Sequence, residues 1–135
     1  MALAWDNSLE LGVLEIDDQH REVFRLFEKL SAACQGGHGE GVLDEVLTFM
    51  EDYVEHHFSS EEALMIQHHY PKLPEQQEQH AILRHEIEVL RNRFREGEHG
   101  QELAMAVDRQ LVRWLIKHIR SFDREMAEYI KAHPA

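Results

Sequence analysis

The sequence has a single cysteine, few prolines and no long hydrophobic run. Its 135 residues include 1 Cys and 3 Pro, and 14 Lys and Arg stand against 26 Asp and Glu. A lone cysteine excludes an internal disulfide, and the lack of a long apolar run excludes a transmembrane segment. The formal net charge of −12 argues against binding to a phosphate backbone. We therefore expect neither a nucleic-acid nor a membrane partner.

The N-terminal segment also lacks the features of a secretory signal. The first residues, MALAWDNSLEL, contain no basic residue followed by an apolar stretch and no small-residue cleavage site. We therefore expect a cytoplasmic protein. Cys34 is expected to be a small buried apolar filler without a chemical role.

Clusters of glycine and proline divide the chain into four long segments. Apolar residues recur within each segment at spacings of three and four, as in helices, and no stretch alternates with the period of a strand. A chain of 135 residues fits one compact domain. We predict a single all-α domain over 1–135, an antiparallel up-down-up-down four-helix bundle. It has an N-terminal arm over 1–16 and helices at about 17–35, 41–68, 73–96 and 101–131.

Polar residues interrupt the apolar stripes of the first two predicted helices. The sequence has 11 His, and imidazole is a common ligand of transition metals. His20 lies four residues before Phe24, within about 40° of it around a helix of 3.6 residues per turn. His57 and Glu61 lie at positions i and i+4, so they stack on one face. All three side chains are therefore expected to face the core.

The last two predicted helices show the same pattern. Gln76 and His80 are the only polar members of the third apolar stripe, and His118 lies between Trp114 and Phe122 on the fourth. These side chains are also expected to face the core.

Asp123 needs separate treatment. It follows His118 by five residues, which is roughly 140° around an ideal helix. Asp123 could reach the core from the flank of the stripe, or through a single π-type turn of the kind often found at functional sites.

Four imidazoles and two carboxylates in one core would be very unstable without a ligand, because each unpaired buried charge costs several kcal/mol. Two carboxylates suit a dinuclear metal site, and mixed ligation favours iron, with manganese or zinc behind it. Ferritin-like sites are richer in carboxylates, and an iron-free structural protein would leave the cluster unexplained. The other seven histidines are interpreted as surface or cap residues: His38, His56, His68, His69, His85, His99 and His133.

Four motifs together resemble the bacterial hemerythrins, over most of the chain from Trp5 to about Tyr129. They are Ile16-Asp17-Asp18-Gln19-His20, His57-Phe58-Ser59-Ser60-Glu61-Glu62, Tyr70-Pro71, and Trp114-Leu115-Ile116-Lys117-His118-Ile119 followed by Asp123. The resemblance implies a non-haem centre of two iron ions, oxo- or hydroxo-bridged when oxidised. It implies two histidine pairs and two bridging carboxylates as ligands: His20 with His57, His80 with His118, and Glu61 and Asp123 as the bridges.

The same resemblance implies reversible binding of dioxygen, and thus oxygen storage or delivery rather than enzymatic turnover. It implies an apolar oxygen pocket lined by Trp114, Leu115 and Ile119. Gln76 stands where the family has a fifth histidine. This substitution leaves two alternatives open: a sensor of oxygen, redox state or NO that acts through a partner, or a peroxide-consuming di-iron enzyme. Gln76 is then a possible iron ligand, and NO, peroxide and azide-like anions are further possible ligands of the iron.

Overall fold

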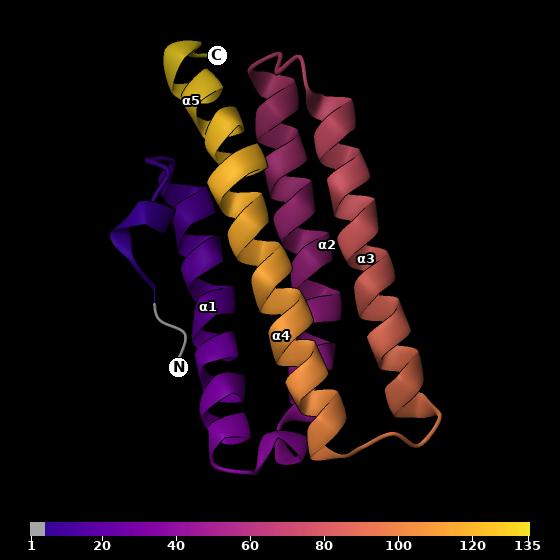
Figure 1. The fold of residues 1–135 in the computed structure, drawn as a ribbon. Helices are drawn as coiled ribbons and strands as arrows, with labels where there is room; N and C mark the ends of the chain where they lie inside the picture. The colour runs from indigo at the N-terminus through magenta and orange to yellow at the C-terminus, as the bar shows by residue number, and fades with distance from the viewer. Residues whose placement is uncertain (1–4) are drawn as a thin grey trace.

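The computed structural model describes residues 5–135, which form four long antiparallel helices (Figure 1). Their bounds are Leu14–Gln35 for α1, Leu43–Gln67 for α2, Leu73–Arg95 for α3 and Gln101–His118 for α4. A π-turn, Ile119–Asp123 (η3), continues α4 into α5, Arg124–Ala132. Each helix packs on two neighbours, α1 and α3 both contacting α2 and α4. The predicted all-α, up-down-up-down bundle is confirmed.

Apolar side chains at helical spacing fill the interior. Phe24 and Phe27 of α1 are 1% and 0% exposed, and they belong to a cluster that also includes Leu47 of α2 and Leu111 of α4. Full burial of a side chain of this size contributes about 1.5–3 kcal/mol. A smaller cluster lies further along α2 and α5 and comprises Met65, Tyr70, Met126 and Ile130. Between these two clusters, every long helix carries buried polar residues.

The first helix begins at Leu14, three residues before the predicted start at 17. No side chain caps this end, because the N-cap position is held by Val13. Asp17, predicted to begin the helix, is a buried residue of its first turn, and its carboxylate accepts the N–H groups of Leu11 at 2.9 Å and Gly12 at 3.1 Å. The missing cap signal explains the error.

The arm before α1 is correspondingly shorter than the predicted 1–16. Its residues 1–4 lie outside the described residues, and a short 3-10 helix, Asn7–Leu9 (η1), follows. Lys131 of α5 donates to the carbonyl oxygen of Leu11 at 2.6 Å, and Arg124 donates to that of Ser8. The arm is therefore fastened to the helix that follows the π-turn.

The second helix begins at Leu43 rather than 41, because Gly39–Gly41 forms a separate 3-10 turn (η2). A Cβ atom on Gly39 would lie 2.7 Å from Cys34 Sγ and 2.8 Å from the Cβ of Ala104, so only glycine fits there without a shift. Cys34 packs against the core but is half-buried rather than fully buried as predicted.

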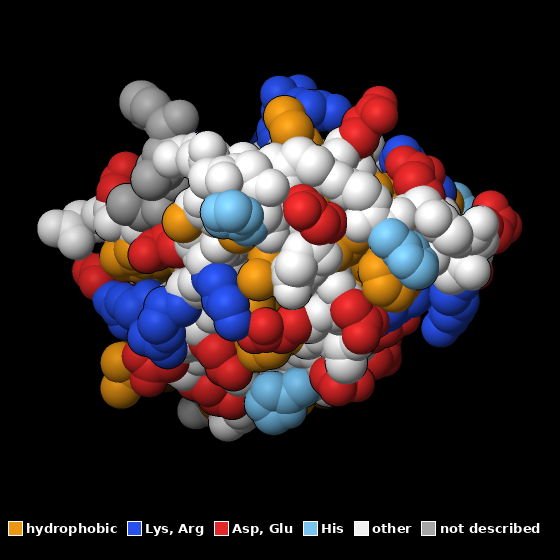
Figure 2. Space-filling view, turned by 90° about the horizontal axis from the view of Figure 1, so that it is seen from below, with side chains coloured by type: hydrophobic (Ala, Val, Ile, Leu, Met, Phe, Trp, Pro, Cys, Tyr) orange, Lys and Arg blue, Asp and Glu red, His pale blue; other side chains and the backbone are white. Residues whose placement is uncertain are grey.

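One end of the bundle has a largely polar surface. Figure 2 shows the end of the bundle that carries the α1–α2 and α3–α4 connections, where acidic, basic and histidine side chains are interspersed and hydrophobic ones appear in scattered spots. Among the described residues, no helix has the length and apolar character needed to cross a bilayer.

Candidate metal centre

Asp123 reaches the core because the last helix widens after His118. Residues Ile119–Asp123 form a π-turn, in which hydrogen bonds close from i to i+5 and bring residues five apart onto one side. His118 Nε2 lies 3.1 Å from Asp123 Oδ1, and Asp123 is fully buried. Of the two routes that the sequence left open for Asp123, the structure shows the π-turn.

The six side chains predicted to bind metal come together in the core. Each is at most 3% exposed: His20, His57, Glu61, His80, His118 and Asp123. Their nitrogen and oxygen atoms form two groups, and within each group these atoms lie within 4.8 Å of one another. The first group contains His20, His57, Glu61 and Asp123, and the second contains Glu61, His80 and His118.

Glu61 is shared by the two groups. Its Oε1 lies 3.1 Å from His80 Nε2, and its Oε2 lies 3.2 Å from His57 Nε2. Each oxygen of this one carboxylate therefore faces a different group.

Asp123 is placed in the same way from the opposite side. Its Oδ1 faces His118 Nε2 at 3.1 Å, and its Oδ2 faces His20 Nε2 at 3.2 Å. Both carboxylates thus extend across the space between the two groups.

Several of these buried polar atoms have no hydrogen-bond partner. They are both ring nitrogens of His20 and of His118, Glu61 Oε2, Asp123 Oδ2 and Gln76 Oε1. His20 Nε2 lies close to a carboxylate oxygen but does not meet it with hydrogen-bond geometry. Each such unsatisfied atom costs about 1–3 kcal/mol, so hydrogen bonding alone explains the cluster poorly. Imidazole and carboxylate groups that lie this close together, with several of their nitrogen and oxygen atoms left without hydrogen bonds, fit a transition-metal site.

A comparison with known families agrees with this donor set. The model of the hemerythrin HHE cation binding domain matches residues 11–130. The chain belongs to this hemerythrin family.

Several proteins named bacteriohemerythrin are similar to the chain over nearly its whole length. The protein of Stenotrophomonas maltophilia is 32% identical over 131 residues, covering 97% of this chain and 83% of the relative. The protein of Pseudomonas aeruginosa is 33% identical over 131 residues, with 96% and 80% covered. The protein of Methylococcus capsulatus is 32% identical over 127 residues, with 92% and 94% covered.

Two residues of this hemerythrin-family chain, Glu62 and Gln19, hold imidazoles from outside the cluster, and neither was predicted to have a role. His80 Nδ1 donates to Glu62 Oε2 at 2.9 Å, and His57 Nδ1 donates to Gln19 Oε1 at 2.5 Å. Such outer partners fix the orientation of a ring and leave Nε2 facing the site. Each residue is adjacent in the sequence to a predicted ligand. Its contact, however, crosses to another helix, and residue spacing along one helix does not predict such a contact.

Gln76, the position that departs from the hemerythrin pattern, touches the cluster. It is 1% exposed, and its Nε2 donates to Asp123 Oδ1 at 3.1 Å. Its Oε1 has no partner. Three other side chains of α3 that could bind a metal, Glu75, Glu78 and His85, are exposed and lie outside the cluster.

The buried charges shift one another strongly. Burial opposes protonation of His20, but the carboxylates of Asp123 and Glu61 outweigh it and raise the pKa of His20 to about 9. Burial and repulsion from Glu61 favour the neutral form of Asp123, but His118 and His20 outweigh both and lower its pKa to about 2. Burial likewise opposes ionisation of Glu61, yet the surrounding histidines hold its pKa well below the ordinary value. In the absence of a metal, His20 would therefore hold a proton at neutral pH, and a metal ion would have to displace it.

Aromatic and apolar side chains surround His118. Its ring stacks on Trp114 with centroids 4.5 Å apart and on Phe122 with centroids 5.5 Å apart. Leu115 and Ile119, three residues before and one residue after His118, are buried, and Trp114 is half-buried. The predicted oxygen-pocket residues therefore lie on the helix turns around one of the candidate ligands.

The seven remaining histidines stay outside the cluster. Six are exposed, namely His38, His56, His69, His85, His99 and His133. His68 is half-buried, and its Nδ1 donates a hydrogen bond to the carbonyl oxygen of His133 at 2.8 Å.

Proposed function

We propose that this chain binds two iron ions in the buried centre and that the pair binds dioxygen reversibly. The observation that carries the proposal is the division of the donor atoms into two groups that share Glu61. His20 and His57 would hold one ion and His80 and His118 the other, with Glu61 and Asp123 as bridges. When bound, a pair of ferrous ions would supply the two electrons that reversible dioxygen binding needs.

The chain's own residues set the conditions of that binding. Gln19 and Glu62 hold His57 and His80 in one orientation, so the donor nitrogens are in place before a metal arrives. Burial keeps water away from the carboxylates. The buried apolar side chains of Leu115 and Ile119 extend this water-excluding environment along α4 and the π-turn. Excluding water slows the transfer of protons from solvent to the bound ligand.

Gln76 adjoins the second group, because the carboxylate oxygen to which it donates is the one that faces His118. We propose that the second ion has one imidazole ligand fewer than in the five-histidine set. An amide oxygen is a poorer donor than imidazole, so this ion would be held more weakly and would be more open to exchangeable ligands.

The proposal is tested by loading the full chain anaerobically with ferrous iron, counting iron per chain, and recording the visible spectrum as dioxygen is added and removed. We expect two irons and a charge-transfer band that appears with dioxygen and disappears without it. A zinc-loaded sample is the control and should show no band, since zinc has no redox chemistry. Two irons that oxidise without the reversible band, or fewer than two irons, would refute the proposal.

Peroxide consumption is a second candidate use of the same centre, and Gln76 is the observation that favours it. Steady-state turnover of hydrogen peroxide with a reductant separates the two, because an oxygen carrier gives no turnover beyond slow decay. A matched test is the Gln76→His variant, which should suppress such turnover if the open position is responsible.

A further inference from the structure

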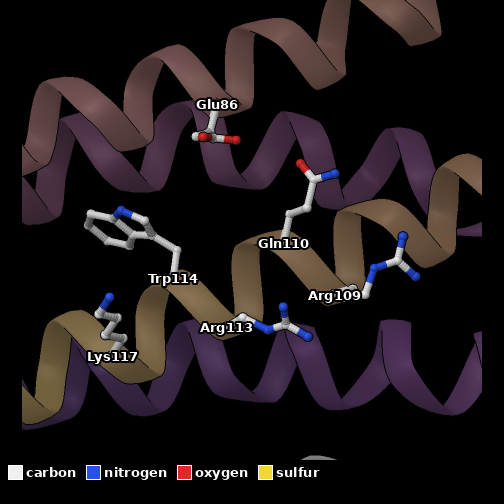
Figure 3. A pocket seen from close by; sticks show the side chains of 6 residues that line it. All are labelled: Glu86, Arg109, Gln110, Arg113, Trp114 and Lys117. Atoms are coloured by element: carbon white, nitrogen blue, oxygen red, sulfur yellow. The ribbon is translucent and has the colours of Figure 1, made fainter.

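We propose that a groove between α3 and α4 is the docking site of an acidic one-electron carrier protein that returns an oxidised metal centre to its reduced state. The inference rests on the proposed function, since it needs iron in the centre. The groove is lined by Glu86 of α3 and by five residues of α4, Arg109, Arg113, Lys117, Gln110 and Trp114. Figure 3 shows Trp114 and Gln110 rising from α4 toward α3, with the three cations along α4.

Three basic residues of the groove carry positive charge on a molecule in which acidic residues are in excess. Arg109, Arg113 and Lys117 follow one another at intervals of four residues, so they line one face of α4. Within residues 5–135, none of the three is within ion-pair distance of a carboxylate, whereas Lys29, Arg84 and other cations are paired. On a chain with net charge −12, three unpaired cations in a row attract an acidic surface that the rest of the molecule repels.

The shape of the groove favours a protein rather than a small molecule. Its volume is about 450 Å³ and it is open to solvent, whereas small-molecule sites enclose most of the ligand surface. Ile82 and Val89 of α3 are 41% and 44% exposed and lie one turn to either side of Glu86. Such apolar positions beside a charged row suit the small, electrostatically oriented interfaces of electron-transfer complexes.

Trp114 connects this surface to the centre. Its indole lines the groove, and it also stacks on the His118 ring at 4.5 Å between centroids with 14° between the planes. His118 Nε2 in turn lies 3.1 Å from Asp123 Oδ1 in the cluster. An electron delivered at the groove therefore has a short path through two stacked rings to a ligand of the second ion.

The chemical step is a one-electron transfer. The reduced carrier, an iron–sulfur or flavin protein, would lose one electron, and one ferric ion of the centre would gain it and become ferrous. No bond would form or break in the chain, and two successive docking events would reduce both ions.

Docking is tested first on the zinc-loaded full chain, labelled with nitrogen-15 and titrated with a plant-type two-iron, two-sulfur ferredoxin, which is acidic. We expect amide shifts in residues 109–117 that weaken as salt is added. The Arg113→Glu/Lys117→Glu variant should lose these shifts. The Arg25→Glu/Arg95→Glu variant is the control, because it changes the net charge equally at two exposed sites away from the groove.

Electron transfer is then measured by stopped-flow mixing of reduced ferredoxin with the oxidised, iron-loaded chain. We expect the groove variant to lower the second-order rate constant by about tenfold or more at low salt, and the control to change it by less than about twofold. Equal slowing in both variants, amide shifts elsewhere, or shifts with inorganic phosphate but not with ferredoxin would each overturn the proposal. If instead the iron centre fails to form, docking to the zinc-loaded chain persists while reduction is absent, so the two failures are distinguishable.

Discussion

Asp123 and His118 lie five residues apart, yet Asp123 Oδ1 is 3.1 Å from His118 Nε2 because a π-turn separates them. In an ideal α-helix the two side chains would point roughly 140° apart. The turn lets one helix supply a histidine to the second group while its carboxylate also faces His20 of the first group. The placement of Asp123 between the two donor groups thus depends on one local departure from helical regularity.

Replacing Asp123 with asparagine should weaken that arrangement. Asparagine keeps the shape of the side chain but removes its charge and one of its two acceptor oxygens. We expect Asp123→Asn to lower iron affinity by at least about tenfold, so that fewer than two irons per chain survive desalting. Asp52→Asn, at an exposed position of α2, is the control and should retain both. Unchanged iron content in Asp123→Asn would show that Asp123 is not a bridge.

The partner of His80 outside the cluster gives a second prediction. Glu62→Ala removes the acceptor of His80 Nδ1, and loss of such a partner typically lowers metal affinity by about 10–100-fold. Glu62→Gln keeps an amide oxygen that can accept from the same nitrogen, so its loss should be smaller. Competition with a chelator measures both affinities. A loss as large in Glu62→Gln as in Glu62→Ala would mean that charge, and not ring orientation, is what Glu62 contributes.

The metal-free chain should respond to pH through His20 and Asp123. The folded pKa of His20 is raised from 6.5 to about 9, so its stabilising contribution is fully present below pH 6.5 and is lost as pH rises through about 9. The pKa of Asp123 is lowered from 3.8 to about 2, so its contribution is present above pH 3.8 and is lost as pH falls toward 2. Urea unfolding of the metal-free chain across this range measures both.

A control variant isolates the alkaline limb of that profile. His20→Gln should abolish the loss of stability near pH 9, whereas His85→Gln, at an exposed position, should keep it. Binding of zinc at pH 7 should release protons, since a ligand histidine must be neutral. Zinc binding without proton release would contradict a protonated His20 in the metal-free state.

Gln76 gives a prediction specific to this chain. Gln76→His would restore an imidazole beside the second group, and we expect the oxygenated form to decay more slowly than in the native chain. Gln76→Leu keeps the side chain's approximate volume but removes the hydrogen bond to Asp123, and it should not lengthen the lifetime. The decay of the visible band after oxygenation measures each lifetime. No lengthening in Gln76→His would exclude Gln76 as the cause of a short-lived oxygenated form.

Much of the candidate site followed from the sequence because a polar residue on an apolar stripe is a local pattern. His20, His57, Glu61, His80 and His118 were all placed in the core by helical spacing alone, and all five are buried. For Asp123 the sequence left two routes into the core open, the flank of the stripe and a π-turn. It could not decide between them, because the residues of Ile119–Asp123 carry no signature of a π-turn.

Contacts between helices could not be predicted from the spacing of residues within one helix. Gln19 lies beside the apolar stripe of α1, and only the packing of α2 against α1 brings its amide to His57. The start of α1 was misplaced for a related reason, because the carboxylate of Asp17 serves the arm and not the helix end. In both cases the side chain makes its contact outside its own helix, where residue spacing gives no information.

The order of the ligands along the chain has a consequence for how the protein is made. The first group is incomplete without Asp123, and the second is incomplete without His118, so both depend on the last helix. During synthesis, a chain that still lacks this helix holds neither full set of donors. Under the proposed function, iron insertion would therefore follow completion of the polypeptide, and a partly synthesised chain would not hold ferrous iron where oxygen could reach it.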